Sequence, residues 1–128
     1  MEFPQDLRFT KSHEWIRKGD DGKVVIGISA FAVEQLGDIT LVELPDVGKD
    51  FDAGADLGTI ESVKSVSDLY APIAGKVTKI NEELDDSPEL VNEDPYGKGW
   101  LLELEPADPA AVDALLDAAA YGELVAAQ

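Results

Sequence analysis

The sequence contains no cysteine and a single histidine among its 128 residues. Without a thiol, the chain can form neither a disulfide nor a thiolate metal site, and it has no cysteine nucleophile. Having only one histidine, His13, argues against a Ser-His-Asp triad and against a zinc site built from several imidazoles. Any sulfur chemistry must therefore arrive on a covalently attached group.

Positive charge and long apolar runs are also scarce. The 10 Lys and Arg residues are outnumbered by 27 Asp and Glu residues, and the net charge of −17 repels nucleic-acid phosphates and anionic membrane surfaces. No apolar run reaches the roughly eighteen residues of a membrane span. The opening residues, MEFPQDLRFT, lack the basic and apolar regions of a secretory signal. We therefore expect a cytoplasmic protein that partners neither nucleic acid nor membrane.

Aromatic residues make up only 7% of the chain, whereas hydrophobic residues make up 45%. The core must therefore consist mainly of Val, Ile, Leu and Ala. Turn signals separate about six or seven short strand-like segments. This pattern predicts a mainly β fold, a flattened barrel or sandwich of two sheets, with short helices and a C-terminal helix. At this length we expect a single domain over residues 1–128.

Local signals predict the elements of the first half. The turn signal KGDDGK predicts a hairpin between residues 7–17 and a second strand within residues 23–29. Ser29 as an N-cap and Gly37 as a stop predict a helix over residues 30–36. The next segment, DITLVEL, is apolar on both faces, which favours a central strand over an edge strand.

Similar signals predict the elements near the C-terminus. Ser87 followed by proline predicts the start of one helical turn, and WLLELE predicts a strand that begins at Trp100. Asp108 followed by proline predicts a C-terminal helix over about residues 108–121. Residues 122–128 are expected to fray.

The run ESVKSVSDLYAP is nearly mirror-symmetric about Lys64 and Ser65. A hairpin that doubles back at this point would place Val63 opposite Val66. Each pair of residues further out would also consist of two residues of the same chemical type. Two-residue hairpin turns favour Asn-Gly or Asp-Gly, because those residues accept positive φ cheaply. Lys-Ser is a poor choice for that geometry, which indicates another turn type or a lysine selected for a function.

Three uses of Lys64 are open. It could deter edge pairing, serve as a modification site, or act as a Schiff-base catalyst. A catalytic lysine needs burial to lower its amine pKa from about 10.4 toward 7, whereas a lysine at a hairpin tip is open on most sides. The small serines around it and the acids that bracket the run favour the modification site.

The segment KSHEW offers a second polar group. His13 could belong to an acid-base site, but no second catalytic residue lies near it in sequence, and packing near Trp15 is the favoured interpretation. Ser12 and Glu14 remain candidates for holding a polar ligand. The acidic pairs at 20–21 and 85–86 lack calcium-loop spacing and are read as turn and cap residues.

Several segments together resemble the H-protein family of the glycine cleavage system. They are SHEW, GISAFAVEQLGDITLVELPDVG, ESVKSVSDLYAPIAGKV and PELVNEDPYGKGWL, and the resemblance extends from about Leu7 to Tyr121. The run ESVKSVSDLYAP is the most specific part and is similar to the family's lipoyl-attachment hairpin, with Lys64 at the modified position. Three positions depart from the family's usual residues, namely Phe9, Phe31 and Leu41.

The resemblance implies a non-catalytic carrier with lipoic acid in amide linkage on Lys64. A lipoate ligase or a lipoyl/octanoyl transferase would attach it. A pyridoxal-phosphate glycine decarboxylase would load the aminomethyl group of glycine, and a tetrahydrofolate-dependent aminomethyltransferase would unload it. Dihydrolipoamide dehydrogenase would then reoxidise the arm. A shuttle of this kind is most simply a monomer.

The resemblance also implies roles for further residues. Ser12, Glu14 and Asp68 are expected to line a cleft that shelters the loaded arm. Recognition of the attachment hairpin is assigned to its other residues, namely Glu61, Ser62, Val63, Ser65, Val66 and Ser67.

Alternative functions remain open from the sequence. A relay protein that donates lipoyl groups to other lipoyl domains would share the same features. A lipoyl domain of a 2-oxoacid dehydrogenase is shorter and is normally tethered, and a biotinyl domain usually has methionines on both sides of its lysine. An enzyme that uses Lys64 directly would need a second convergent acid-base residue.

Overall fold

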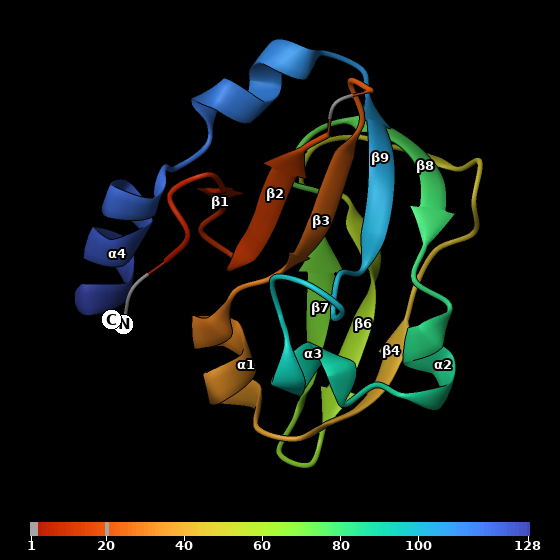
Figure 1. Ribbon diagram of the computed structural model, residues 1–128, viewed down its shortest axis with the longest axis vertical. Coiled ribbons are helices and arrows are strands. Elements are labelled where there is room, and N and C mark those ends of the chain that lie inside the picture. Colours follow the sequence, from red (N-terminus) through yellow and green to blue (C-terminus); the bar gives the residue numbers. More distant parts are fainter. Residues whose placement is uncertain (1–2, 20) are drawn as a thin grey trace.

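The computed structural model describes residues 3–19 and 21–128, which form two antiparallel sheets with helices around them (Figure 1). The larger sheet has the order β1 (Arg8–Phe9), β2 (Glu14–Lys18), β3 (Val24–Ile28), β9 (Leu102–Pro106), β8 (Gly75–Ile80) and β5 (Asp50–Phe51). The smaller sheet has the order β4 (Ile39–Glu43), β6 (Asp56–Ser62) and β7 (Val66–Tyr70). The predicted fold class is confirmed, while the single-domain assignment over 1–128 stays a prediction.

The main core lies between the two sheets. Alternate residues of β3 face inward as predicted, and Ile26 is fully buried. They pack in one cluster with Val42, Ile60 and Leu69 of the smaller sheet. Aliphatic side chains fill this cluster, as the composition requires.

Helix α1 (Ala30–Leu36) has the predicted bounds and caps. The Ser29 hydroxyl accepts the N–H of Ala32 at 3.2 Å, which satisfies one of the free donors of the first turn. Gly37 ends the helix with φ of 76°, and its N–H binds the carbonyl of Val33. The predicted hairpin with β3 is confirmed, since Glu14 pairs with Ile28, but residues 7–17 contain two paired strands, β1 and β2, instead of one. Asp20 of its turn lies outside the described residues.

The prediction of a central strand at DITLVEL is wrong, because β4 is an edge strand of the smaller sheet. An irregularity in its pairing between Ile39 and Leu41 breaks the alternation, so Ile39 and Val42 are both buried while Leu41 is 39% exposed. Leu44, beyond the strand, packs against the core. The apolar residues on both faces therefore reflect a bulge and not a second covering layer.

Two further cap and strand predictions are wrong in detail. Ser87 ends α2 (Glu83–Asp86) instead of starting a helix, and α3 (Leu90–Glu93) begins after a turn in which the Leu90 N–H binds the Ser87 carbonyl. Strand β9 begins at Leu102, and Trp100 packs against a second aromatic cluster instead of the main core.

The predicted C-terminal helix over 108–121 is split in two. A 3-10 helix, η1 (Pro109–Ala114), begins after Asp108, whose side chain accepts the Ala110 N–H at 3.1 Å as a cap. A separate helix, α4 (Ala118–Ala126), follows, so most of the residues expected to fray are helical. The split occurs because the backbone of Leu116 pairs with Phe9 through two hydrogen bonds of 2.7 and 3.0 Å.

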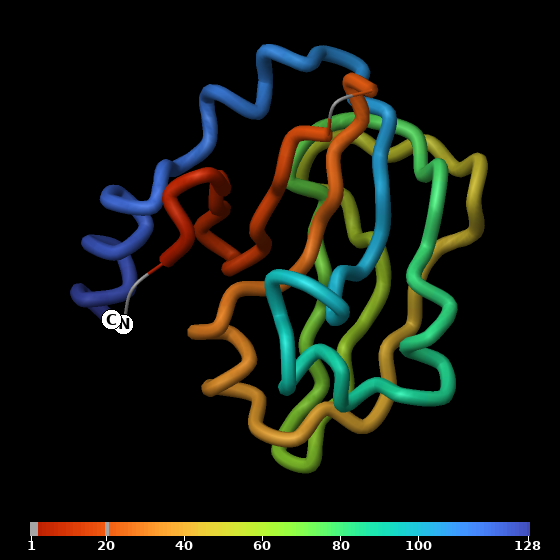
Figure 2. The backbone as a smooth tube through the Cα atoms, viewed as in Figure 1, coloured from red at the N-terminus to blue at the C-terminus, as the bar shows by residue number. Residues whose placement is uncertain are grey.

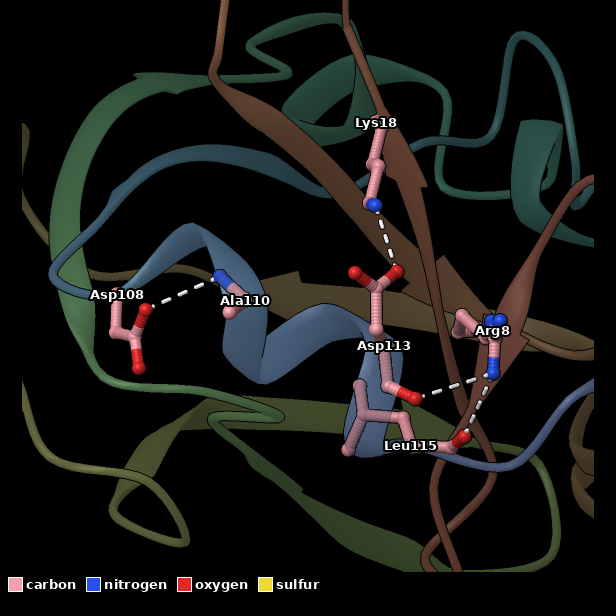
Figure 3. A network of polar contacts seen from close by, with 6 residues as sticks. All are labelled: Arg8, Lys18, Asp108, Ala110, Asp113 and Leu115. Carbon is pink, nitrogen blue, oxygen red and sulfur yellow. Dashed lines mark hydrogen bonds and ion pairs between the residues drawn. The ribbon is translucent and has the colours of Figure 1, made fainter.

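Basic side chains of the larger sheet hold η1 (Figure 3). Lys18 forms an ion pair with Asp113 at 2.7 Å, and this contact lowers the pKa of the Asp113 carboxyl. The Arg8 guanidinium donates to the carbonyls of Asp113 and Leu115. Because the ion pair is exposed, it contributes little to stability.

Helix α4 covers a second core made of aromatic residues. Phe9 stacks on Tyr121 with ring centroids 4.4 Å apart, and Phe3 meets the same tyrosine edge-on. Figure 2 shows α4 (blue) beside the described start of the chain (red). None of the helices in residues 3–19 and 21–128 has the length and apolar character of a membrane span.

Candidate functional site

The hairpin of β6 and β7 carries Lys64 at its tip, but not in the predicted register. Glu61 pairs with Val66, Ile60 with Ser67 and Thr59 with Asp68. The N–H of Ser62 binds the carbonyl of Ser65 at 2.8 Å, so Val63 and Lys64 form the tip. The predicted mirror pairing of Val63 with Val66 is therefore wrong by a shift of two residues.

A serine makes this turn without left-handed backbone. Among the described residues, His13 is the only non-glycine residue with positive φ, so neither Val63 nor Lys64 adopts it. The Ser62 hydroxyl accepts the N–H groups of Lys64 and Ser65, each at 3.2 Å. This side-chain-to-backbone motif replaces the Asn-Gly chemistry of common hairpins. The turn is thus of another type, and the identity of the lysine is not needed to form it.

The tip is open to solvent. Lys64 is exposed, and its neighbours Val63 and Val66 are 67% and 63% exposed. The ion pairs found in the described part of the chain involve Lys18 and Lys23, not Lys64. Such exposure suits a modified lysine and does not provide the burial that a Schiff-base catalyst needs.

A cleft of about 460 Å³ lies beside the hairpin. Ser12, Glu14 and Asp68, predicted to line one cleft, all border this cavity, although they come from distant parts of the chain. Ser67 of the hairpin borders it too, as does the α1 face that carries Ala32. The other hairpin residues to which recognition is assigned lie at the tip or next to it along the chain.

Glu14 is a buried carboxylate, only 2% exposed. The hydroxyls of Thr10 and Ser12 both donate to its Oε1, at 2.5 and 2.6 Å, and the Tyr70 N–H donates to Oε2 at 3.4 Å. No Lys, Arg or His of residues 3–19 and 21–128 forms a salt bridge with it. Glu14 therefore brings to the cleft a negative charge that neutral donors hold in place.

A second cavity of about 420 Å³ shares Ser12 and Glu14 with the cleft. Tyr70 also lines it, and the Tyr70 hydroxyl lies 3.5 Å from Asp68 Oδ2. The charge of Asp68 is the main cause that raises the pKa of Tyr70. Acidic groups thus dominate the electrostatics on both sides of Glu14.

His13 occupies the strained backbone between the two cleft residues, with φ of 74°. Its Nδ1 lies 2.7 Å from the Tyr121 hydroxyl, which lies 2.7 Å from the Ser29 hydroxyl. Burial lowers the pKa of His13 and raises that of Tyr121 to about 12. His13 is half-buried, as expected, and its ring faces Phe31 and Tyr121.

One assignment of protons satisfies both hydroxyl hydrogens of this network. Ser29 accepts from the Ala32 N–H and donates to Tyr121, which donates to Nδ1 of a neutral His13. The network ties α4 to the rim of the cleft. Sequence reasoning missed Ser29 and Tyr121 in this role, because no local pattern links two residues so far apart.

Within the described ranges, no group of three or more His, Asp or Glu side chains is arranged to hold a metal ion.

Comparison with known proteins identifies the family. The family model for the glycine cleavage H-protein matches residues 7–128. The chain therefore belongs to the glycine cleavage H-protein family. The family resemblance seen in the sequence is thereby confirmed, and the chain is a lipoyl-carrier component of the glycine cleavage system.

Individual members of the H-protein family match over almost the whole chain. The glycine cleavage system H protein of Anaeromyxobacter sp. (strain K) is 52% identical over 128 residues, which are 100% of this chain and 99% of that protein. That of Magnetococcus marinus is 57% identical over 94% of this chain and 86% of its own. The crystal structure of a Mycobacterium marinum H protein superposes with a TM-score of 0.86 at 43% identity, covering 94% of this chain and 97% of that one.

Proposed function

We propose that this H-family chain carries lipoic acid on Lys64 and moves the aminomethyl group of glycine between enzymes without itself catalysing a step. One observation carries the proposal: an exposed lysine at the tip of a hairpin lies beside a cleft that contains a buried carboxylate. Bound to Lys64, a lipoyl group would supply the disulfide that a chain without cysteine lacks.

The residues around Lys64 fit such a group. The Ser62 hydroxyl holds the turn through backbone N–H groups, so the lysine amine stays free for amide formation. The cleft, at about 460 Å³, lies in the size range of small-molecule pockets. Its lining combines apolar residues such as Ile60 and Leu36 with the polar groups of Ser12 and Asp68.

Within the cleft, Glu14 is the group that would hold a positive charge. A carboxylate removed from water attracts an ammonium group more strongly than an exposed one does. Thr10 and Ser12 fix its Oε1 by donating from their hydroxyls, so the charge points in one direction. The apolar part of the lining would reduce the contact of a bound group with water. These features support the proposal that the cleft protects a labile group that carries an amine.

The proposed partners follow from this chemistry. They are a pyridoxal-phosphate glycine decarboxylase, a tetrahydrofolate-dependent aminomethyltransferase, dihydrolipoamide dehydrogenase, and a lipoate ligase or lipoyl/octanoyl transferase. The net charge of −17 favours docking surfaces that are basic. As a carrier that visits several enzymes in turn, the chain is expected to act as a monomer in the cytoplasm.

A reconstituted reaction tests the proposal. The lipoylated chain is mixed with glycine and a glycine decarboxylase, and release of carbon dioxide is measured against Lys64→Arg treated in the same way. We expect release with the native chain alone. No release from a lipoylated native chain, together with transfer of its lipoyl group to another lipoyl domain, would support the relay function instead.

A further inference from the structure

The hairpin tip rests on a three-residue loop, Gly37–Ile39, which follows α1 and ends at the first residue of β4. The Val63 N–H donates to the Asp38 carbonyl at 3.0 Å, and Ile39 is the ladder partner of Ser62. The tip and this loop lie side by side in the ribbon and in the tube (Figures 1 and 2). An exposed two-residue tip is therefore bonded to a second segment directly beside its lysine.

Gly37 provides the surface over which the lysine side chain lies. A Cβ atom built at Gly37 would come within 3.3 Å of Lys64 Cε and 3.7 Å of Nζ. The backbone there has φ of 76° and ψ of −150°, a region that is essentially restricted to glycine. The backbone conformation thus favours glycine under the lysine, and a Cβ atom there would displace the lysine side chain by a few tenths of an ångström.

Asn92 of α3 holds both ends of the loop. Its side-chain Oδ1 accepts the Ile39 N–H at 2.9 Å, and its Nδ2 donates to the Gly37 carbonyl at 2.8 Å. The neighbouring residue Val91 is fully buried, which anchors α3 to the core. Asn92 therefore connects the core of the protein to the loop that carries the tip.

We propose that the Gly37–Ile39 loop, clamped by Asn92, is a platform that fixes how Lys64 is presented to the enzyme that attaches the lipoyl group. Gly37 and Asn92 are positioning residues for that attachment. A tip held in one geometry loses less conformational entropy when an enzyme binds it. The inference rests on the proposed function, because it assumes attachment at Lys64.

Glycine substitutions at two positions of positive φ test the platform. Gly37→Ala introduces a side chain at positive φ and crowds Lys64, whereas Gly54→Ala introduces one at φ of 84° with no atom within 4 Å. Gly54 lies before β6, at the opposite end of the hairpin from Lys64. Attachment is followed by intact mass with a lipoate ligase, lipoate and ATP, at a temperature where all variants are folded. We expect kcat/KM to fall about tenfold for Gly37→Ala and to remain near native for Gly54→Ala.

Asparagine substitutions provide an independent pair. Asn92→Ala removes both clamping hydrogen bonds, while Asn81→Ala removes two bonds to the carbonyls of Lys98 and Trp100, away from the hairpin. We expect attachment to slow about fivefold for Asn92→Ala alone, since each hydrogen bond contributes modestly. Amide hydrogen exchange at Val63 should accelerate in Asn92→Ala and stay unchanged in Asn81→Ala. We expect this difference regardless of which of the two variants has the lower melting temperature.

The outcomes separate the inference from the function on which it rests. If the native chain is modified and all four variants match it, or if the control variants slow as much as Gly37→Ala and Asn92→Ala, the platform role is wrong. If the native chain gains no lipoyl group while an established acceptor does, the proposed attachment fails, and the positioning role fails with it.

Discussion

Glu14 is the residue whose environment most directly suggests a purpose. It is buried and charged, and it receives hydrogen bonds from two hydroxyls and one backbone N–H. Buried charges are usually paired, because leaving water is costly. A carboxylate that only neutral groups satisfy is poised to accept a cationic partner from the cleft.

Substitution of Glu14 tests this function at the scale of one residue. Glu14→Gln keeps the shape but removes the charge, so a bound ammonium group loses its attraction. We expect ammonia release from the loaded carrier, measured without the aminomethyltransferase, to rise about tenfold, which corresponds to about 1.4 kcal/mol. Glu105→Gln removes the same charge from an exposed position on β9 and should leave the rate unchanged. Equal rates for Glu14→Gln and the native chain would count against the cation site.

His13 should make stability depend on pH. Burial lowers its pKa below the ordinary value of 6.5, so between the two values the unfolded chain binds more protons than the folded chain. Stability from this group is present above pH 6.5 and is lost as the pH falls toward the folded pKa. His13→Asn tolerates the left-handed backbone and does not titrate. Urea unfolding between about pH 5 and pH 8 should show a steeper loss for the native chain, and parallel curves would contradict this.

At the scale of elements, short local sequence signals predict some helices and strands correctly and fail for others. Helix α1 was predictable because its cap and stop are adjacent to it in sequence. The split at Leu116 was not, because it depends on pairing with Phe9, which is remote along the chain. The hairpin register was wrong by two residues, since a shift of two leaves every side chain on the same face. Only the Ser62 turn distinguishes the two registers.

Two glycines in different elements should respond in opposite directions. A Cβ at Gly27 of β3 would lie 2.5 Å from the ring of buried Trp15, its strand partner, so Gly27→Ala should cost about 3 kcal/mol. A Cβ at Gly122 of α4 meets only Phe3, at an ordinary 4.0 Å, so Gly122→Ala should stabilise by up to about 1 kcal/mol. Urea unfolding measures both. Equal effects of the two substitutions would show that the contact with Trp15 does not determine the loss of stability in Gly27→Ala.

At the scale of the whole molecule, two sheets form the core, while the candidate site lies along one edge of the smaller sheet. The fold class could be predicted because strand-length segments and turns dominate the sequence. Lys64, Ser12 and Glu14 could be named because they belong to short motifs. Ser29, Asn92 and Tyr121 could not, since each acts through contacts that only the folded chain creates.

The most direct measurement is the intact mass of the chain after incubation with a lipoate ligase, lipoate and ATP, with Lys64→Arg treated in parallel. A lipoyl carrier of this design should gain one lipoyl group on the native chain and none on the variant. Modification of both proteins would place the arm on another lysine. Modification of neither, with a ligase that is active on an established acceptor, would contradict attachment at the hairpin.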